Sequence, residues 1–133
     1  FGTGASFGFS PATRAEGVTP AADPHLPQPL WFKDYAVDVE QADPDSMLAL
    51  YRAALAIRQE SLTATRDTTA EQVDMGDDVV EYTRAAVGGR VFTSITNFGN
   101  APVALPDGSV VLASGPLTPE GQLPTDTSAW VVQ

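Results

Sequence analysis

One stretch of the sequence has a clear helical period. Between residues 44 and 62, apolar side chains recur three and four positions apart, which places them along one side of an α-helix. Asp43 can cap this helix, Pro44 suits its first turn, and Asp45 puts negative charge near the positive end of the helix dipole. We therefore predict a helix over residues 44–62. Its apolar side needs a protein surface to cover it, and its members are Met47, Leu48, Tyr51, Ala54, Leu55 and Leu62.

The segment before this helix, residues 1–42, shows neither a helical nor an extended period. Glycines and prolines are spread through it, and proline removes an amide donor and favours extended geometry in the residue before it. We predict an irregular path that packs against protein outside this chain, because a solvated linker needs few large apolar groups. Trp31, Phe32 and Tyr35 suit either a sugar-stacking platform or an anchor on a neighbouring core, and we expect the anchor. The large apolar residues of the segment are Phe1, Phe7, Phe9, Leu26, Leu30, Trp31, Phe32 and Tyr35.

From about residue 70 the pattern changes to short extended runs between turns. Residues 79–83 and 91–96 flank Gly88-Gly89 and predict a β-hairpin. Together with the later runs they predict an antiparallel meander of roughly five or six strands, folded as a small sandwich. The later strand candidates are residues 103–105, 110–112 and 129–132.

Composition and charge exclude several kinds of partner. A net charge of −10 repels phosphate, so we expect no nucleic-acid partner and no docking on anionic lipid. The absence of cysteine excludes a disulfide framework and a thiolate metal site. No apolar run approaches the roughly 18 residues that a membrane helix needs. We expect a soluble, cytoplasmic protein without a cofactor, and because residue 1 is Phe we expect that the native start lies elsewhere.

Three patterns are similar to catalytic or metal sites. Gly4-Ala5-Ser6-Phe7-Gly8 fits a hydrolase nucleophile elbow, but that site needs a preceding strand and a nearby base. His25 is the sole histidine and has no partners with zinc-ligand spacing. We therefore predict a turn at Ser6, a packed or surface His25, and no catalytic or metal-binding residue. The remaining candidates are carboxylates, which we assign to turns, to capping and to the approach to the helix: Asp34, Asp38, Glu40, Asp43, Asp45, Asp74, Asp77 and Asp78.

The order of several short runs is more specific than any single motif. These runs are Phe7-Gly8-Phe9-Ser10, Leu26-Pro27-Gln28-Pro29, Asp43-Pro44-Asp45-Ser46, Asn97-Phe98-Gly99 and Leu123-Pro124-Thr125-Asp126-Thr127. In this order the chain resembles the carboxy-terminal quarter of bacterial α-glucosidases of the α-amylase superfamily, glycoside hydrolase family 13. It departs from that pattern at His25, where Trp is common in the family, and at Ala36, Val37 and Glu40 ahead of the helix.

The resemblance implies an α+β fragment. Residues 1–65 would be the end of a (β/α)₈ catalytic barrel, namely the loop after the last strand and the final outer helix. Residues 66–133 would be a C-terminal antiparallel β-sandwich domain. The helix with its uncovered apolar side favours this assignment over the alternative, an independent β-sandwich module with a binding or structural role.

The implied activity is retaining hydrolysis of α-glucosidic bonds in oligosaccharides. The family's catalytic Asp, Glu and Asp come from earlier barrel strands, so none of them is carried over onto this sequence. We expect the chain to supply a pocket-rim loop and a stabilising β domain, with the rest of the barrel and an oligosaccharide substrate as partners. From loop position alone, Phe7 and Phe9 are the expected rim residues.

Overall fold

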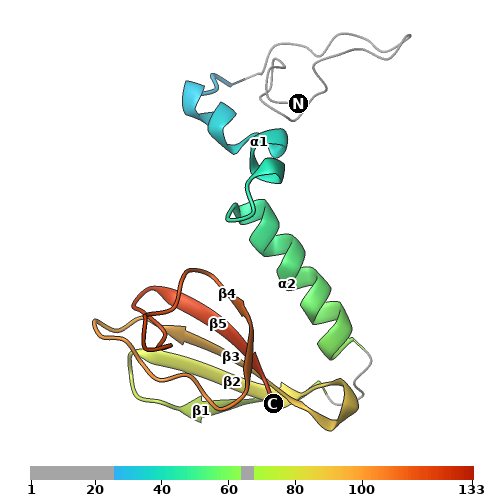
Figure 1. Cartoon of the computed structure of the whole chain (residues 1–133), viewed down its shortest axis with the longest axis vertical. Coiled ribbons are helices and arrows are strands. Elements are labelled where there is room, and N and C mark those ends of the chain that lie inside the picture. Colours follow the sequence, from blue (N-terminus) through green and yellow to red (C-terminus); the bar gives the residue numbers. More distant parts are fainter. Residues whose placement is uncertain (1–25, 64–67) are drawn as a thin grey trace. The chain divides into compact units, whose positions relative to one another are not determined.

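A computed structural model describes residues 26–63 and 68–133 of the chain (Figure 1). The chain divides into two compact units, Phe1–Arg52 and Ala53–Gln133. In the described residues, no helix combines the length and the apolar character that crossing a membrane requires. Phe7, Phe9 and His25 lie outside the described residues.

The described part of the first unit contains two short helices. The 3-10 helix η1 spans Leu30–Tyr35 and the α-helix α1 spans Val37–Ala42. The prediction of an irregular path is therefore wrong for these residues. No proline or glycine lies between Pro29 and Pro44, so nothing interrupts the helical turns. Each helix has only six residues, which is too short for an apolar period to show.

The predicted long helix is present as α2, Met47–Leu62, and begins three residues later than expected. Ser46 is its cap: the hydroxyl accepts the Ala49 N–H at 3.1 Å and donates to the Glu40 carbonyl at 2.6 Å. Asp43 instead accepts the Asp45 N–H at 2.9 Å and closes a turn before the helix. Asp and Ser are comparable caps, and here the Asp side chain bonds two residues ahead in the chain and does not reach the helix.

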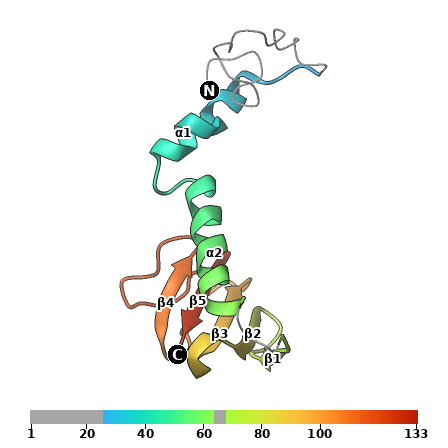
Figure 2. The same cartoon turned by 90° about the vertical axis from the view of Figure 1, so that its right-hand side faces the viewer.

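The second unit contains one five-stranded sheet with only antiparallel neighbours (Figures 1 and 2). The predicted hairpin is confirmed as β2 and β3, joined through the short 3-10 helix η2. The order β1-β2-β3-β5-β4 departs from a simple meander because β5 lies between β3 and β4. The element bounds are β1 Ala70–Asp74, β2 Val79–Ala85, η2 Val87–Gly89, β3 Val91–Asn97, β4 Ser109–Ala113 and β5 Thr127–Val132.

Loops, and not a second sheet, cover one face of this sheet in the described residues. The predicted strand at residues 103–105 forms only an isolated bridge, Val103 to Leu123. The antiparallel β domain is thus confirmed, whereas the sandwich is replaced by a single sheet with loop cover. Its core consists of Val79, Ile95, Leu123 and Ala129, with Val103, Leu105, Ala113 and Leu117 packed against them.

The C-terminal half of α2 packs on the other face of the sheet. Successive strand residues point to opposite faces, so Phe92 and Val132 lie opposite Ile95 and Ala129. The Phe92 and Trp130 rings meet edge to face with their centroids 5.3 Å apart. This second core consists of Ala86, Phe92 and Val132, with Ile57, Leu62 and Trp130 packed against them.

Gly108 lies immediately before β4, at a point where no larger residue fits. Its φ is +130°, and an added Cβ would lie 2.8 Å from the Val132 carbonyl oxygen and 2.9 Å from Val131 Cγ1. We expect Gly108→Ala to lower the free energy of unfolding by about 2 kcal/mol, because it adds backbone strain and a backbone clash. Urea denaturation of the 133-residue chain, with the exposed Met47, Tyr51 and Leu55 replaced by glutamine to keep it soluble, measures this loss.

A matched control separates the clash from the strain. Gly121 has φ +77°, but an added Cβ there meets nothing within 4 Å. Gly121→Ala should therefore cost only about 1 kcal/mol, the strain alone. Equal losses for the two variants would show that Gly108 does not lie as close to the end of β5 as described.

Candidate functional site

An exposed apolar stripe on α2 is the clearest candidate for a functional surface. Met47, Tyr51 and Leu55 lie four residues apart, so they share one side of the helix. Their exposed fractions are 58%, 63% and 60%, respectively. Side chains of this size lose favourable burial when they face water, so a contiguous set indicates a protein contact. We refer to these three residues as the α2 stripe.

The α2 stripe is distinct from the side of the helix that holds the sheet. Ile57 and Leu62 carry the contact with Phe92 and Val132. In the described residues, the chain itself partly buries Ile57 and Leu62, whereas the stripe stays exposed. The sequence predicted that an apolar side of this helix needs a cover, and the structure shows which residues lack one.

The aromatic side chains of η1 pack mainly on one another. The Trp31 ring meets the Phe32 ring at 4.5 Å and the Tyr35 ring at 5.9 Å between centroids, edge to face in both cases. Both Trp31 and Tyr35 are exposed, and η1 has no buried residue. Their expected role as an anchor on a neighbouring core stays a prediction.

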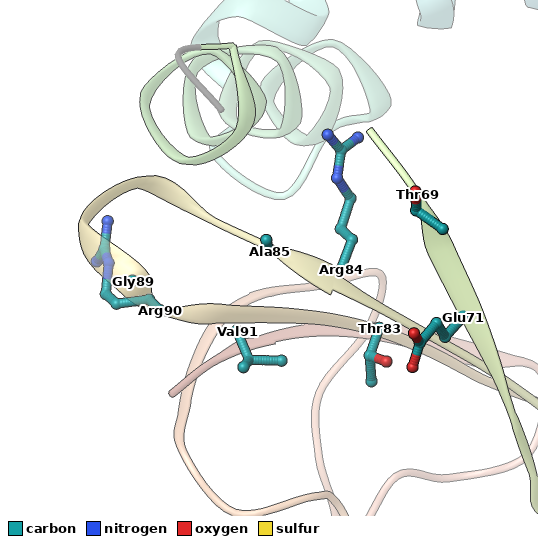
Figure 3. A pocket seen from close by; sticks show the side chains of 8 residues that line it. All are labelled: Thr69, Glu71, Thr83, Arg84, Ala85, Gly89, Arg90 and Val91. Carbon is teal, nitrogen blue, oxygen red and sulfur yellow. The ribbon is translucent and has the colours of Figure 1, made fainter. Parts of the chain in front are cut away.

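One pocket of about 310 Å³ lies at the end of the β2–β3 hairpin. Arg90 is fixed there by its Nε, which donates to the Val87 carbonyl at 3.0 Å. Arg84 extends from one side of the strands, whereas Glu71, Thr83 and Val91 lie on the other (Figure 3). An active site requires polar groups that converge on one point, and the polar groups of this pocket do not. The lining residues are Thr69, Glu71, Thr83, Arg84, Ala85, Gly89, Arg90 and Val91.

Two of the carboxylates that the sequence singled out accept hydrogen bonds from backbone N–H groups. Asp43 accepts the Asp45 N–H, and Asp74 accepts the Gly76 N–H at 3.1 Å in the turn after β1. Within residues 26–63 and 68–133, no group of three or more acidic or histidine side chains is placed to hold a metal ion. Turn and capping roles account for these two aspartates.

Two of the motifs that carry the family resemblance meet at one corner of the sheet. Asn97 is fully buried, and its amide nitrogen donates to the Ala101 carbonyl at 2.9 Å and the Leu123 carbonyl at 3.1 Å. Its Oδ1 accepts the Gly99 N–H at 2.9 Å, and the Thr125 hydroxyl donates to the Gly99 carbonyl. Sequence reasoning quoted both motifs but gave no sign that they touch, since 26 residues separate the partners.

Solved structures match this chain over most of its length. The trehalulose synthase MutB from Pseudomonas mesoacidophila MX-45 matches 84% of the chain at 25% identity with a TM-score of 0.64. A MutB mutant in complex with its substrate sucrose gives the same coverage, identity and TM-score. Another MutB mutant, from crystals soaked with trehalulose, matches 83% of the chain at 24% identity with a TM-score of 0.63. MutB is a family-13 enzyme.

The resemblance to glycoside hydrolase family 13 is confirmed. The chain spans 22% of the length of the family-13 structures it matches. What the match supports directly is the fold, namely helices followed by a small antiparallel β domain. No protein-family model matches the chain, and no curated protein matches it.

Proposed function

We propose that this chain is the carboxy-terminal part of a retaining family-13 enzyme that acts on α-glucosidic bonds in oligosaccharides. In this proposal it supplies a pocket-rim loop, the last outer helix of a (β/α)₈ barrel and a stabilising β domain. The catalytic carboxylates belong to the rest of the polypeptide, which we call the catalytic portion. The two parts together are called the whole enzyme below. Phe7 and Phe9 remain the proposed rim residues.

The observation that carries the proposal is the match to MutB over 84% of the chain at 25% identity. A match that covers nearly all of this chain but 22% of the other fits a part of an enzyme better than an independent module. The trehalulose synthase acts on sucrose, a sugar with an α-glucosidic bond, which supports the proposed bond class. The bond and the sugar that this chain's enzyme prefers depend on the catalytic portion.

The α2 stripe supports the same proposal on physical grounds. In an independent module, three exposed large apolar side chains on one helix would favour aggregation. The outer helices of a barrel present an apolar side to the strands, and that side is buried only when the barrel is present. The catalytic portion is therefore the proposed cover of Met47, Tyr51 and Leu55.

An assay of the whole enzyme tests the proposed activity. We expect release of 4-nitrophenol from 4-nitrophenyl α-glucoside and no release from the β-glucoside, which serves as the matched control. Because a retaining enzyme conserves the configuration at the anomeric carbon, the first sugar product seen by NMR should be the α-anomer. Hydrolysis of the β-glucoside, or a β-anomer as the first product, would contradict the proposal.

A further inference from the structure

The chain contains a single Asp-Gly pair, Asp107-Gly108, in the loop immediately before β4. An aspartate before a glycine is chemically reactive, because the glycine amide can attack the aspartate carboxyl group and no Cβ blocks its approach. Both residues are exposed. Among the described residues, the Gly108 N–H has no hydrogen-bond acceptor and the Asp107 carboxylate has no donor. Neither reacting group is therefore held away from the other.

The structure distinguishes this pair from other aspartates that have an amide within reach. Asp45 is the one aspartate followed by a serine, but the Ser46 N–H donates to the Asp43 carbonyl at 3.2 Å and Ser46 is buried. Two further aspartates precede residues with a branched Cβ, which crowds the attacking amide. These are Asp78, before Val79, and Asp126, before Thr127.

We propose that Asp107 is a modification site, at which the aspartate converts to isoaspartate through the Gly108 amide. The amide nitrogen bonds to the side-chain carboxyl carbon, and the amide proton leaves with the carboxyl hydroxyl as water. A succinimide ring remains. Water then adds to the former main-chain carbonyl and opens the ring to isoaspartate, so the composition is unchanged and nothing is oxidised or reduced. This inference does not depend on the proposed function.

The packing around Gly108 gives the modification a structural consequence. Isoaspartate carries the main chain through its side chain and so adds a methylene group to the backbone. An added Cβ on Gly108 would already lie 2.8 Å from the Val132 carbonyl oxygen, so the loop has no room to absorb that group. The Asp107 carbonyl that accepts the Gln133 Nε2 hydrogen bond becomes a carboxylate outside the main chain. We expect the first pair of β4, Ser109 with Val132, to loosen.

Peptide mapping of aged protein tests the modification. The species that carries this sequence, as it is purified, is kept at growth temperature for several weeks and then digested with trypsin. Arg90 is the last basic residue, so residues 91–133 stay in one peptide, in which Asp107 and Asp126 are the aspartates. Endoproteinase Asp-N cuts before aspartate and not before isoaspartate. Cleavage before residue 107 should fall several-fold while cleavage before Asp126 is kept, and equal cleavage at both would overturn the inference.

Two controls separate the site from its surroundings. Asp107→Glu keeps the charge but lengthens the side chain, which disfavours ring closure, so methyl transfer by an isoaspartyl methyltransferase to residue 107 should be lost. A synthetic peptide of residues 101–113 gives the rate of isomerisation without the fold. A rate in the protein about tenfold or more below that of the peptide would show that the fold protects the site, and would overturn the inference.

Urea denaturation of aged protein tests the consequence for β4. Molecules with isoaspartate at residue 107 should unfold at a lower urea concentration than unaged molecules, because the pairing of β4 with β5 is weakened. Asp107→Glu protein aged in the same way should keep its midpoint. An unchanged midpoint in isomerised protein would overturn the loosening of β4.

Discussion

Replacing Met47, Tyr51 and Leu55 together by glutamine is expected to change the isolated chain and the whole enzyme in opposite directions. In the isolated chain the α2 stripe faces water, and we expect that chain to be poorly soluble or partly molten. The substitutions remove exposed apolar surface while keeping good helix formers, so the soluble fraction should rise. A sharp, cooperative unfolding transition in the unmodified isolated chain would contradict this expectation.

In the whole enzyme the same substitutions should be destabilising. Each stripe residue that is buried against the catalytic portion contributes about 2 kcal/mol, so the midpoint of thermal inactivation should fall by several degrees and α-glucosidase turnover at elevated temperature should be lost. The matched control replaces the exposed Arg52, Arg58 and Glu60 of the same helix by glutamine, which should leave both properties near the original. If the stripe variant and this control behave alike in both proteins, the stripe is not an interface.

Asn97→Ala is expected to cause a large loss of stability in the β domain. Asn97 has no exposed surface, and its side chain makes three hydrogen bonds to backbone groups of Gly99, Ala101 and Leu123. Alanine removes the partner of the buried Gly99 N–H, the hydrogen bond to the Ala101 carbonyl and one of the two hydrogen bonds to the Leu123 carbonyl, which also accepts the Val103 N–H, at a cost of about 3 kcal/mol. Urea denaturation of the 133-residue chain that carries the three glutamine substitutions measures the loss.

The neighbouring Asn100 provides the control for that substitution. It is exposed, so Asn100→Ala should change the free energy of unfolding by about 0.5 kcal/mol or less. A loss of less than about 1 kcal/mol for Asn97→Ala would show that the corner where Asn97 and Leu123 meet is not formed as described.

The sequence predicted those elements whose patterns are long or bounded by clear turns. Helix α2 has sixteen residues with a helical apolar period, and the β2–β3 hairpin is marked by two alternating runs around Gly88-Gly89. The strand β1 was not predicted, because its residues are almost all exposed and show no apolar alternation. The cap at Ser46 was missed because Asp43 has an equal intrinsic preference for that role.

Features that depend on contacts far apart in the chain had no local signal. The position of β5 between β3 and β4 depends on pairing of residues more than thirty positions apart, such as Ile95 with Ala129. The Asn97 corner likewise joins two motifs that the sequence offers separately. For the candidate surface, the sequence pattern predicted an uncovered apolar side of the helix, but only the exposed fraction of each residue showed that this side is Met47, Tyr51 and Leu55.

The central claim is that this chain is part of a larger family-13 enzyme. The most direct measurement is the intact mass of the species that carries this sequence when it is purified from its source cell, followed by an assay on 4-nitrophenyl α-glucoside. The account predicts a mass well above the 14.0 kDa of this chain, or copurification with a larger catalytic fragment, together with turnover. A lone species at 14.0 kDa without turnover would contradict it.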